Sequence, residues 1–457
     1  MSSSLPAVSV AERLAERIAV LDPARLPTAV RAKCEQLLID VIGLAIAARR
    51  EDYVASVRAA WDDGGVCTAI GHAEPVSAAG AAFVNGTAVH GEDFDDTFEG
   101  GPVHAGAVIV PSVLAACERH GPDGPAALLG IAVGVETMCR LSLVVPKAVH
   151  RAGFHPTAVL GAVGAAAGVG AALRLNQRQL VDALGNVGSM AGGIIEYLAE
   201  GAWTKRLHPG WAAQSGLRAA LLGRAGFLGP RTVFEGVHGL FNAFAHTADG
   251  DYDALLGDFG TRWVTETLAF KPYPCGTMTH PYIDCARRLA ARGIKAADIA
   301  ELVCEVGEGT VHRLWEPLAD KQRPPNGYAG KFSTPYCLAY GFVHGGVGLE
   351  AFTNAAVRDA DVLALAAKVT YAIDPKNPYP ANYTGHIRAT LRDGTSVEER
   401  QPHLRGGAHE PLARRDIEDK FRLNARHGGW EGERIDAALA LGATLFDGRV
   451  DLKTLRG

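Results

Sequence analysis

Positive charge is not in excess in this sequence. Lys and Arg number 45 against 50 Asp and Glu, which gives a formal net charge of -5. A nucleic-acid-binding protein needs a basic surface, so we expect no nucleic-acid partner. Eight cysteines are present but no two form a C-x-x-C pair. This spacing argues against a zinc ribbon and against clustered iron–sulfur ligation, and disulfides are not expected in a large chain without an export signal.

The sequence has little that points to a membrane or to export. Its first residues, MSSSLPAVSVAERLAERIAV, contain no basic segment followed by an apolar run. The stretch that most resembles a membrane span is Thr157 to Leu173, which is dominated by Ala and Gly and flanked by His155 and Arg174. Such a composition favours a buried helix with close helix–helix contacts. We therefore expect a cytoplasmic protein without a membrane partner.

Motifs for common cofactors and nucleophiles are missing as well. We find no G-x-x-x-x-G-K-[ST] phosphate loop, no dinucleotide fingerprint in a strand–turn–helix context and no G-x-S-x-G motif. What is present is the ordinary mixture of a soluble globular protein, with 48% hydrophobic and 21% charged residues. A chain of 457 residues is too long for one core, which suggests two domains.

Apolar periodicity predicts a helical first half and a mixed region after Phe270. The expected helices are Val8–Ala19, Leu26–Ala47, Ser77–His90, Ile109–Arg119, Gly124–Val144, Pro156–Leu173 and Ala212–Ala225. Beyond Phe270 we expect a helix at Pro281–Arg292, strands at 301–311 and 370–373, and a hairpin at 386–401 around an Asp-Gly turn. The predicted fold is mostly α: a large all-helical domain (1–267 and 406–457) and a smaller α+β domain (268–405).

The segment HGEDFDDT at 90–97 is the first candidate for chemistry, because four acidic residues in five positions repel one another unless something compensates. Three interpretations remain open. The segment could be a solvated acidic loop with capping residues, a divalent metal site with His90 and His104, or a catalytic carboxylate beside histidines.

Histidines and lysines supply the other candidates. His104 and His155 each stand beside glycines at the start of an apolar helix, where free N–H groups and the helix dipole favour an anion. Lys205 and His208 would share one face of a helical turn. The second domain adds the polar candidates Lys271, His280, Lys331, Ser333 and Tyr336. Such a set suits proton transfer next to a carboxylate, where cations stabilise an enediolate-like state.

Six motifs in order resemble the MmgE/PrpD family. They are HGEDFDDT with the following H-x-G, GFHPTAVLG, TKRLHPGWAAQSGLRAALL with GFLGP, KPYPCGTMTHPYID and GKFSTPY, and the resemblance extends from about Val8 to Phe421. It implies a helical domain with a smaller α/β lid domain, a homodimer, and catalysis without metal or organic cofactor, in a site between the domains. The implied active-site residues are Asp93, His104, His155, Lys205, His280 and Tyr336. Secondary candidates for substrate binding are His208, Lys271, Lys331 and Ser333.

The family resemblance implies a lyase that dehydrates or decarboxylates a small di- or tricarboxylate, such as 2-methylcitrate or cis-aconitate. Two alternatives stay open: epimerisation of a dicarboxylate like iminodisuccinate, and a protein that only binds such acids. We would expect a 2-methylcitrate dehydratase to carry a motif like FPAEFH where this chain has Pro272 to Thr279, PYPCGTMT. The 2-methylcitrate label therefore does not follow from the family.

Overall fold

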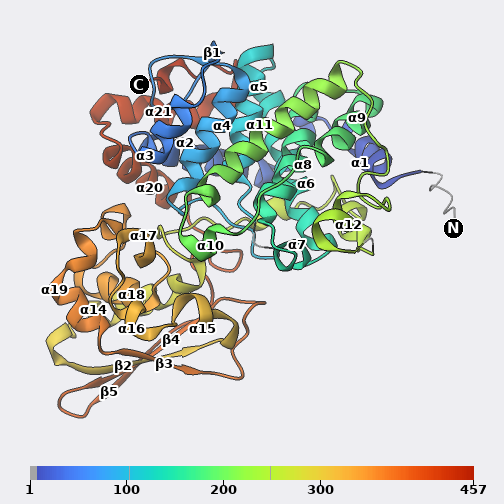
Figure 1. The fold of residues 1–457 in the computed structure, drawn as a ribbon. Coiled ribbons are helices and arrows are strands. Elements are labelled where there is room, and N and C mark those ends of the chain that lie inside the picture. Colours follow the sequence, from blue (N-terminus) through green and yellow to red (C-terminus); the bar gives the residue numbers. More distant parts are fainter. Residues whose placement is uncertain (1–7, 102, 248) are drawn as a thin grey trace. The chain divides into compact units, whose positions relative to one another are not determined.

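The computed structural model describes residues 8–101, 103–247 and 249–457, which form two compact units (Figure 1). Unit 1 comprises the chain up to Gly91, Asp95–Leu268 and Ala413–Gly457, and unit 2 comprises Glu92–Phe94 and Ala269–Leu412. The large helical unit and the smaller α/β unit agree with the predicted fold class. The bounds differ from the predicted ones, because residues 406–412 and the three residues 92–94 cluster with unit 2.

The described residues of unit 1 form helices apart from one short strand, β1 (Gly64–Cys67). Its first helices are α1 (Val10–Ala19), α2 (Thr28–Ala48), α3 (Asp52–Ala59), α4 (Ala78–Gly91), α5 (Gly106–His120), α6 (Gly124–Val144) and α7 (Ala148–Arg151). The others are α8 (Pro156–Ala172), α9 (Gln177–Gly188), α10 (Tyr197–Glu200), α11 (Thr204–Arg224), α12 (Leu240–Ala245), α13 (Tyr252–Leu256), α20 (Arg414–His427) and α21 (Gly432–Thr444).

Glycine allows the central helices of unit 1 to approach closely. A Cβ atom on Gly210 of α11 would lie 2.2 Å from the carbonyl oxygen of Phe83 in α4, and one on Gly86 would lie 2.7 Å from the Cα of Gly210. Such distances are too short for any side chain, so α4 and α11 cross with their backbones nearly in contact. This crossing positions His90 and His208, which stand on these two helices close to the glycines.

Two helices of unit 1 are apolar along nearly their whole length. Helix α6 is long and apolar enough to cross a membrane by length and composition, and 94% of its apolar window is buried inside the protein. Helix α8, which contains all but the last residue of the apolar stretch Thr157 to Leu173, is shorter and is buried from Thr157 to its end. Both helices therefore serve as core helices of unit 1, packed against each other.

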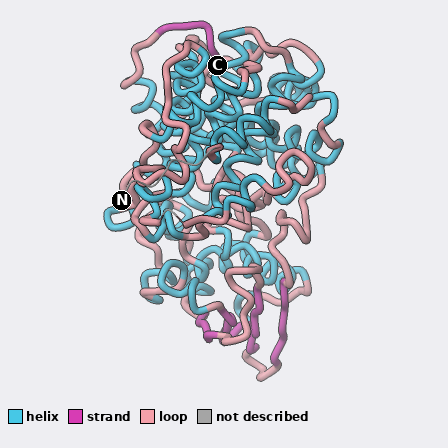
Figure 2. Tube along the Cα trace, turned by 90° about the vertical axis from the view of Figure 1, so that its right-hand side faces the viewer, coloured by secondary structure: helices cyan, strands magenta, loops and turns pink. Residues whose placement is uncertain are grey.

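Unit 2 contains a four-stranded sheet with the order β3-β2-β4-β5 (Figure 2). The strands are β2 (Ile299–Val306), β3 (Val369–Ile373), β4 (Gly385–Leu391) and β5 (Ser396–Gln401), with β2 and β3 parallel and the other pairs antiparallel. The helices are α14 (His280–Ala291), α15 (Glu308–Leu314), α16 (Leu318–Gln322), α17 (Gly327–Gly330), α18 (Thr334–His344) and α19 (Ala360–Ala366). The β4–β5 turn contains Asp393 and Gly394, whose φ of 87° explains the preference for glycine.

Most predicted elements have bounds within three residues of the observed ones, and two differ by more than three residues at one end. The strand predicted at 301–311 ends at Val306, and helix α15 begins at Glu308. Helix α11 begins at Thr204 rather than at Ala212 and continues through Pro209. Proline lacks an N–H and normally interrupts a helix, which is why the sequence pattern favoured the later start.

Candidate functional site

Four histidines from separate parts of the sequence converge inside unit 1. The ring centroids of His90 and His104 are 4.9 Å apart, those of His90 and His155 are 5.8 Å apart, and those of His155 and His208 are 5.3 Å apart. The exposed fractions of His90, His155 and His208 are 1%, 6% and 6%. We call His90, His104, His155 and His208 the histidine cluster.

Two helix starts meet at this cluster. His155 is the N-cap residue of α8 and is followed by Pro156, and His104 stands directly before the N-cap residue of α5. The backbone N–H of His104 donates to Oγ1 of Thr157 in the first turn of α8, at 3.2 Å. The partial positive charges of both helix N-termini are therefore directed toward one region, where they favour a bound anion.

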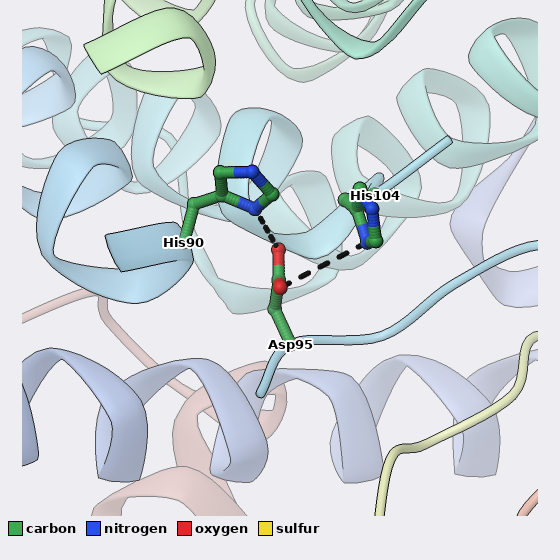
Figure 3. Close-up of side chains that lie close together, drawn as sticks. All are labelled: His90, Asp95 and His104. Atoms are coloured by element: carbon green, nitrogen blue, oxygen red, sulfur yellow. Dashed lines mark hydrogen bonds and ion pairs between the residues drawn. The ribbon is translucent and has the colours of Figure 1, made fainter. Parts of the chain in front are cut away.

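Hydrogen bonds fix the tautomers of two of the histidines. Nδ1 of His104 lies 2.7 Å from the backbone oxygen of Asp96, which can only accept, so this nitrogen carries the proton. Nδ1 of His90 lies 2.7 Å from Oδ2 of Asp95 (Figure 3). With the carboxylate ionised, this nitrogen also carries a proton, and Nε2 of each ring is left as the acceptor.

His155 and His208 share a proton through their Nδ1 atoms, which are 3.1 Å apart. One ring must donate and the other accept, so only one of the two Nδ1 atoms carries a proton. Burial lowers the pKa of His155 well below its ordinary value, and the charges of His90, Lys205 and His208 lower it further. Burial, His90 and Lys205 lower the pKa of His208 to about 4. Both imidazoles are therefore neutral at pH 7 in the absence of an anion.

Asp96 connects the acidic segment to helix α5. Its carboxyl oxygens accept hydrogen bonds from the backbone N–H groups of Ala105 (3.1 Å) and Gly106 (2.8 Å). A Cβ on Gly106 would lie 2.3 Å from Oδ1 of Asp96, so this position requires glycine. Burial and the charge of Asp95 raise the pKa of Asp96 to about 8, against the lowering effect of the two N–H groups. Asp96 therefore holds its proton at pH 7.

His90, Asp95 and His104 also lie close enough to form a metal site, with one potential ligand atom of each within 4.8 Å of the others. The hydrogen bonds oppose this use of the Nδ1 atoms. Nδ1 of His104 donates its proton to a backbone carbonyl, and Nδ1 of His90 is engaged with Asp95. A ligand nitrogen must be unprotonated, so a metal would have to break these bonds or use Nε2.

Unit 2 contains its own group of predicted residues. Nζ of Lys271 donates to the backbone oxygen of Asp93 (3.0 Å) and pairs with its Oδ1 (3.2 Å). Nζ of Lys331 donates to the backbone oxygen of Glu92 (2.8 Å) and pairs with its Oε2 (3.0 Å). Asp93 has a positive φ of 56°. The two lysines therefore neutralise and hold the segment 92–94 within unit 2.

The remaining predicted residues of unit 2 have structural partners. His280 begins α14, and its Nε2 lies 3.2 Å from the backbone oxygen of Cys275. Ser333 is the N-cap of α18 and accepts from the N–H of Tyr336. The hydroxyl of Tyr336 donates to the backbone oxygen of Ala351 at 2.5 Å, and burial raises its pKa. In this arrangement the phenol proton of Tyr336 is committed to the backbone.

Three residues of the cluster region, His90, Asp95 and Tyr197, were not among the active-site residues predicted from the sequence. Asp95 binds His90, and the ring of Tyr197 lies 6.2 Å from that of His155 and 5.8 Å from that of His208. The motif HGEDFDDT contains both His90 and Asp95, and their spacing of five residues was a usable signal. Tyr197 stands in no quoted motif, so only the tertiary structure reveals it.

The sequence comparisons identify the family to which this helical unit with its buried histidine cluster and the α/β unit belong. The family model for the MmgE/PrpD N-terminal domain matches residues 12–253, and the model for the MmgE/PrpD C-terminal domain matches residues 273–441. The chain therefore belongs to the MmgE/PrpD family.

Curated relatives of the chain are decarboxylases. It is 30% identical to cis-aconitate decarboxylase of Homo sapiens over 76% of this chain and 72% of the human protein. It is 26% identical to cis-aconitate decarboxylase-like protein oryM of Aspergillus oryzae, over 92% of both chains. The cis-aconitate decarboxylase of Aspergillus terreus is 26% identical over 88% of this chain and 86% of that protein. These likenesses support an enzyme of the family.

Proposed function

We propose that this protein is a lyase that decarboxylates a small unsaturated di- or tricarboxylate, with cis-aconitate as the first candidate. Two observations support the proposal: the relatives are cis-aconitate decarboxylases, and the histidine cluster of unit 1 is placed at two helix N-termini. The second observation carries the chemistry, because an anionic substrate and a proton-transfer group are needed at the same place.

Charge is the first contribution of the site. A tricarboxylate loses its hydration on binding, so the protein must replace the lost interactions. Lys205, in the first turn of α11, acts electrostatically on both His155 and His208. Its ammonium group and the N-terminus of α8 would hold the carboxylates, whereas the first N–H groups of α5 already donate to Asp96. A fixed cation also stabilises the negative charge that develops during the reaction.

Proton transfer is the second contribution. Loss of carbon dioxide breaks a carbon–carbon bond and leaves an electron pair, which the conjugated double bond spreads onto a second carboxylate. The carbanion-like intermediate then takes a proton from an imidazolium, which solvent reprotonates. The neutral histidines of the empty site gain protons when the substrate's negative charges arrive, because nearby negative charge raises the pKa of an imidazole. The proposed set in unit 1 is therefore His104, His155, His208 and Lys205.

The predicted residues of unit 2 remain predictions of the family resemblance. Asp93 and Lys271 already pair with each other, and the same holds for Lys331 and Glu92. His280, Ser333 and Tyr336 have the backbone partners described above. We propose no step through them.

Proton NMR of a polycarboxylate panel in deuterated water tests the function. We expect cis-aconitate or a close analogue to lose carbon dioxide and to gain one deuterium on the product. His155→Gln, prepared identically, controls for contaminating activity and should be strongly impaired. Dehydration without carbon dioxide, or deuterium entering otherwise unchanged substrate, would replace the proposal by a dehydratase or an epimerase. Saturable binding without turnover of any acid would make the protein a binding protein.

A further inference from the structure

His90 is the member of the histidine cluster with no assigned role. It stands in the last turn of α4, and both its side chain and that of Asp95 have an exposed fraction of 0%. Its ring is the neighbour of two rings of the proposed site, His104 at 4.9 Å and His155 at 5.8 Å. His90 and Asp95 both belong to unit 1, although the intervening segment 92–94 clusters with unit 2.

The two nitrogens of His90 have different environments. Nδ1 is 2.7 Å from Oδ2 of Asp95, and Nε2 is buried with no hydrogen-bond partner among the residues that the structure describes (Figure 3). Buried polar atoms are nearly always paired, so an unpaired one inside a cluster of ionisable rings needs an explanation. A nitrogen that receives and gives a proton during turnover is such an explanation.

Asp95 gives the ring the orientation that this role requires. The carboxylate holds the proton on Nδ1, so Nε2 on the other side of the ring keeps a lone pair that can accept a proton. When Nε2 gains a proton, the negative charge of Asp95 stabilises the imidazolium at short range. Asp96 is compatible with a charged Asp95, because a protonated Asp96 adds no second negative charge beside it.

We propose that His90 is the group that protonates the carbanion-like intermediate and that Asp95 is its positioning residue. This inference rests on the proposed function. In the step, the bond to the departing carboxylate breaks and carbon dioxide leaves with no charge. The electron pair left behind forms a new C–H bond with the proton on Nε2 of His90, and the neutral imidazole recovers a proton from solvent. No oxidant, reductant or other reactant is required.

The stereochemistry of protonation distinguishes this role from a structural one. In deuterated water, a fixed acid delivers deuterium to one face of the product carbon, so wild-type protein should give a single configuration. We expect His90→Gln to lower kcat by about 100-fold or more, in line with the usual contribution of general acid catalysis. Its residual product should be a mixture of the two configurations, because solvent can deliver deuterium to either face. His120→Gln, which changes an exposed histidine at the end of α5, is the matched control and should keep the wild-type rate and configuration.

Asp95→Asn tests the positioning role. It removes the charge that stabilises the imidazolium, so the acidic group in the pH profile of kcat should titrate at a lower pH than in wild type. A fall in kcat with an unchanged profile would show that Asp95 only holds the fold. Circular dichroism of each variant establishes that it is folded before rates are compared.

Nitrogen-15 NMR of histidine-labelled protein supplies a readout that needs no turnover. The signal that disappears in His90→Gln should belong to an Nδ1–H tautomer in wild type. An Nε2–H tautomer would overturn the proposed dyad whether or not the enzyme is active. Conversely, an active wild type whose His90→Gln variant keeps its rate and configuration would overturn His90 as the acid. A wild type inactive on the whole panel would overturn the proposed function instead.

Discussion

The lysine in the first turn of α11 reinforces the effect of burial on the charge state of two histidines. Lys205 lies within electrostatic reach of His155 and His208, and its positive charge is one reason why their pKa values lie below the ordinary value. The same charge would attract the carboxylates of a substrate. Burial and Lys205 together therefore keep both imidazoles neutral, and the same lysine favours the binding of an anion.

Replacing Lys205 with Met tests this double role. We expect Lys205→Met to fold normally and to lose at least about tenfold in kcat/KM, because a charge-assisted contact that strengthens in the transition state contributes about 2–4 kcal/mol. Lys205→Gln should recover little, since a neutral donor does not replace the charge. Steady-state kinetics measures both. Lys453→Met removes an exposed lysine of unit 1 and serves as the control. A wild-type rate in Lys205→Met would move the proposed site away from α11.

Metal removal is the second prediction at this scale. Since the Nδ1 atoms of His90 and His104 are engaged in hydrogen bonds, we expect activity to survive exhaustive treatment with EDTA. The family resemblance also implies catalysis without metal. Activity is measured before and after chelation, with metal content followed by elemental analysis. Loss of activity that added iron or magnesium restores would make His90, Asp95 and His104 a metal site.

At the scale of single elements, the start of α5 depends on a buried carboxyl group. Asp96 accepts from two backbone N–H groups there, and burial and the charge of Asp95 raise its pKa to about 8, well above the ordinary value of a carboxyl group. A carboxyl group whose pKa is raised by folding stabilises the protein fully below its unfolded pKa. It loses that contribution as pH rises toward its folded pKa.

Asp96→Asn should therefore change how stability depends on pH. Asparagine keeps one acceptor and does not titrate, so the advantage of wild type over the variant should shrink between pH 5 and pH 8. The expected slope is at most about 1.4 kcal/mol per pH unit, and it should level off above pH 8. Denaturant unfolding of both proteins at several pH values measures the difference. Comparing the two proteins removes the opposite trend from His155 and His208, whose lowered pKa values cost stability as pH falls below 6.5. A constant difference would contradict the protonated state of Asp96.

The crossing of α4 and α11 gives a further prediction. In Gly210→Ala the new methyl group would meet the carbonyl oxygen of Phe83 at 2.2 Å and Oγ1 of Thr87 at 2.5 Å. The helices must separate, at a cost of about 1–3 kcal/mol, and His208 moves with α11. We expect lower thermal stability together with reduced kcat.

The control for this variant is Gly64→Ala, where among the described residues a Cβ would meet no atom within 4 Å. Differential scanning calorimetry and kinetics are applied to both variants. If Gly210→Ala matched wild type in both measurements, the close crossing of α4 and α11 would be wrong.

The sequence predicts elements where one local signal dominates. Helix α6 has the predicted bounds, because Asp123 caps its start and the following residues are apolar or small. Helix α11 was predicted too short because Pro209 is a strong local signal, whereas the packing of its buried residues outweighs the lost hydrogen bond. Local signals therefore fail where tertiary packing opposes them.

The candidate site follows the same rule. The sequence identified His104, His155 and His208 singly, but their meeting depends on the crossings of α4, α5, α8 and α11. The pairing of His90 with Asp95 requires the chain to turn back across a segment that clusters with unit 2. The spacing of apolar residues along the sequence does not predict such a turn. The residue types indicate proton chemistry, and the tertiary structure selects which residues could perform it.

At the scale of the whole molecule, the charges of the chain do not favour its proposed substrate. A net charge of -5 repels a di- or tricarboxylate on average. Binding must therefore depend on local positive potential, which Lys205 and the N-terminus of α8 supply in unit 1. We expect affinity for a polycarboxylate to fall with ionic strength only weakly, because buried interactions are screened less than exposed ones.

Unit 1 also exposes large apolar side chains in a segment around α10, and we propose that this segment contributes to a homodimer. Ile194, Leu198 and Trp203 have exposed fractions of 60%, 57% and 50%. Large exposed apolar side chains that gather in one segment are candidates for an interaction surface, and the family resemblance implies a dimer through the helical domain. Light scattering should give twice the chain mass, and Leu198→Asp should shift the equilibrium toward single chains. Ile373→Asp, at an exposed apolar position of unit 2, is the matched control and should leave the dimer intact. A particle with the mass of one chain at every concentration would contradict the dimer, and dissociation by both variants would place the interface elsewhere.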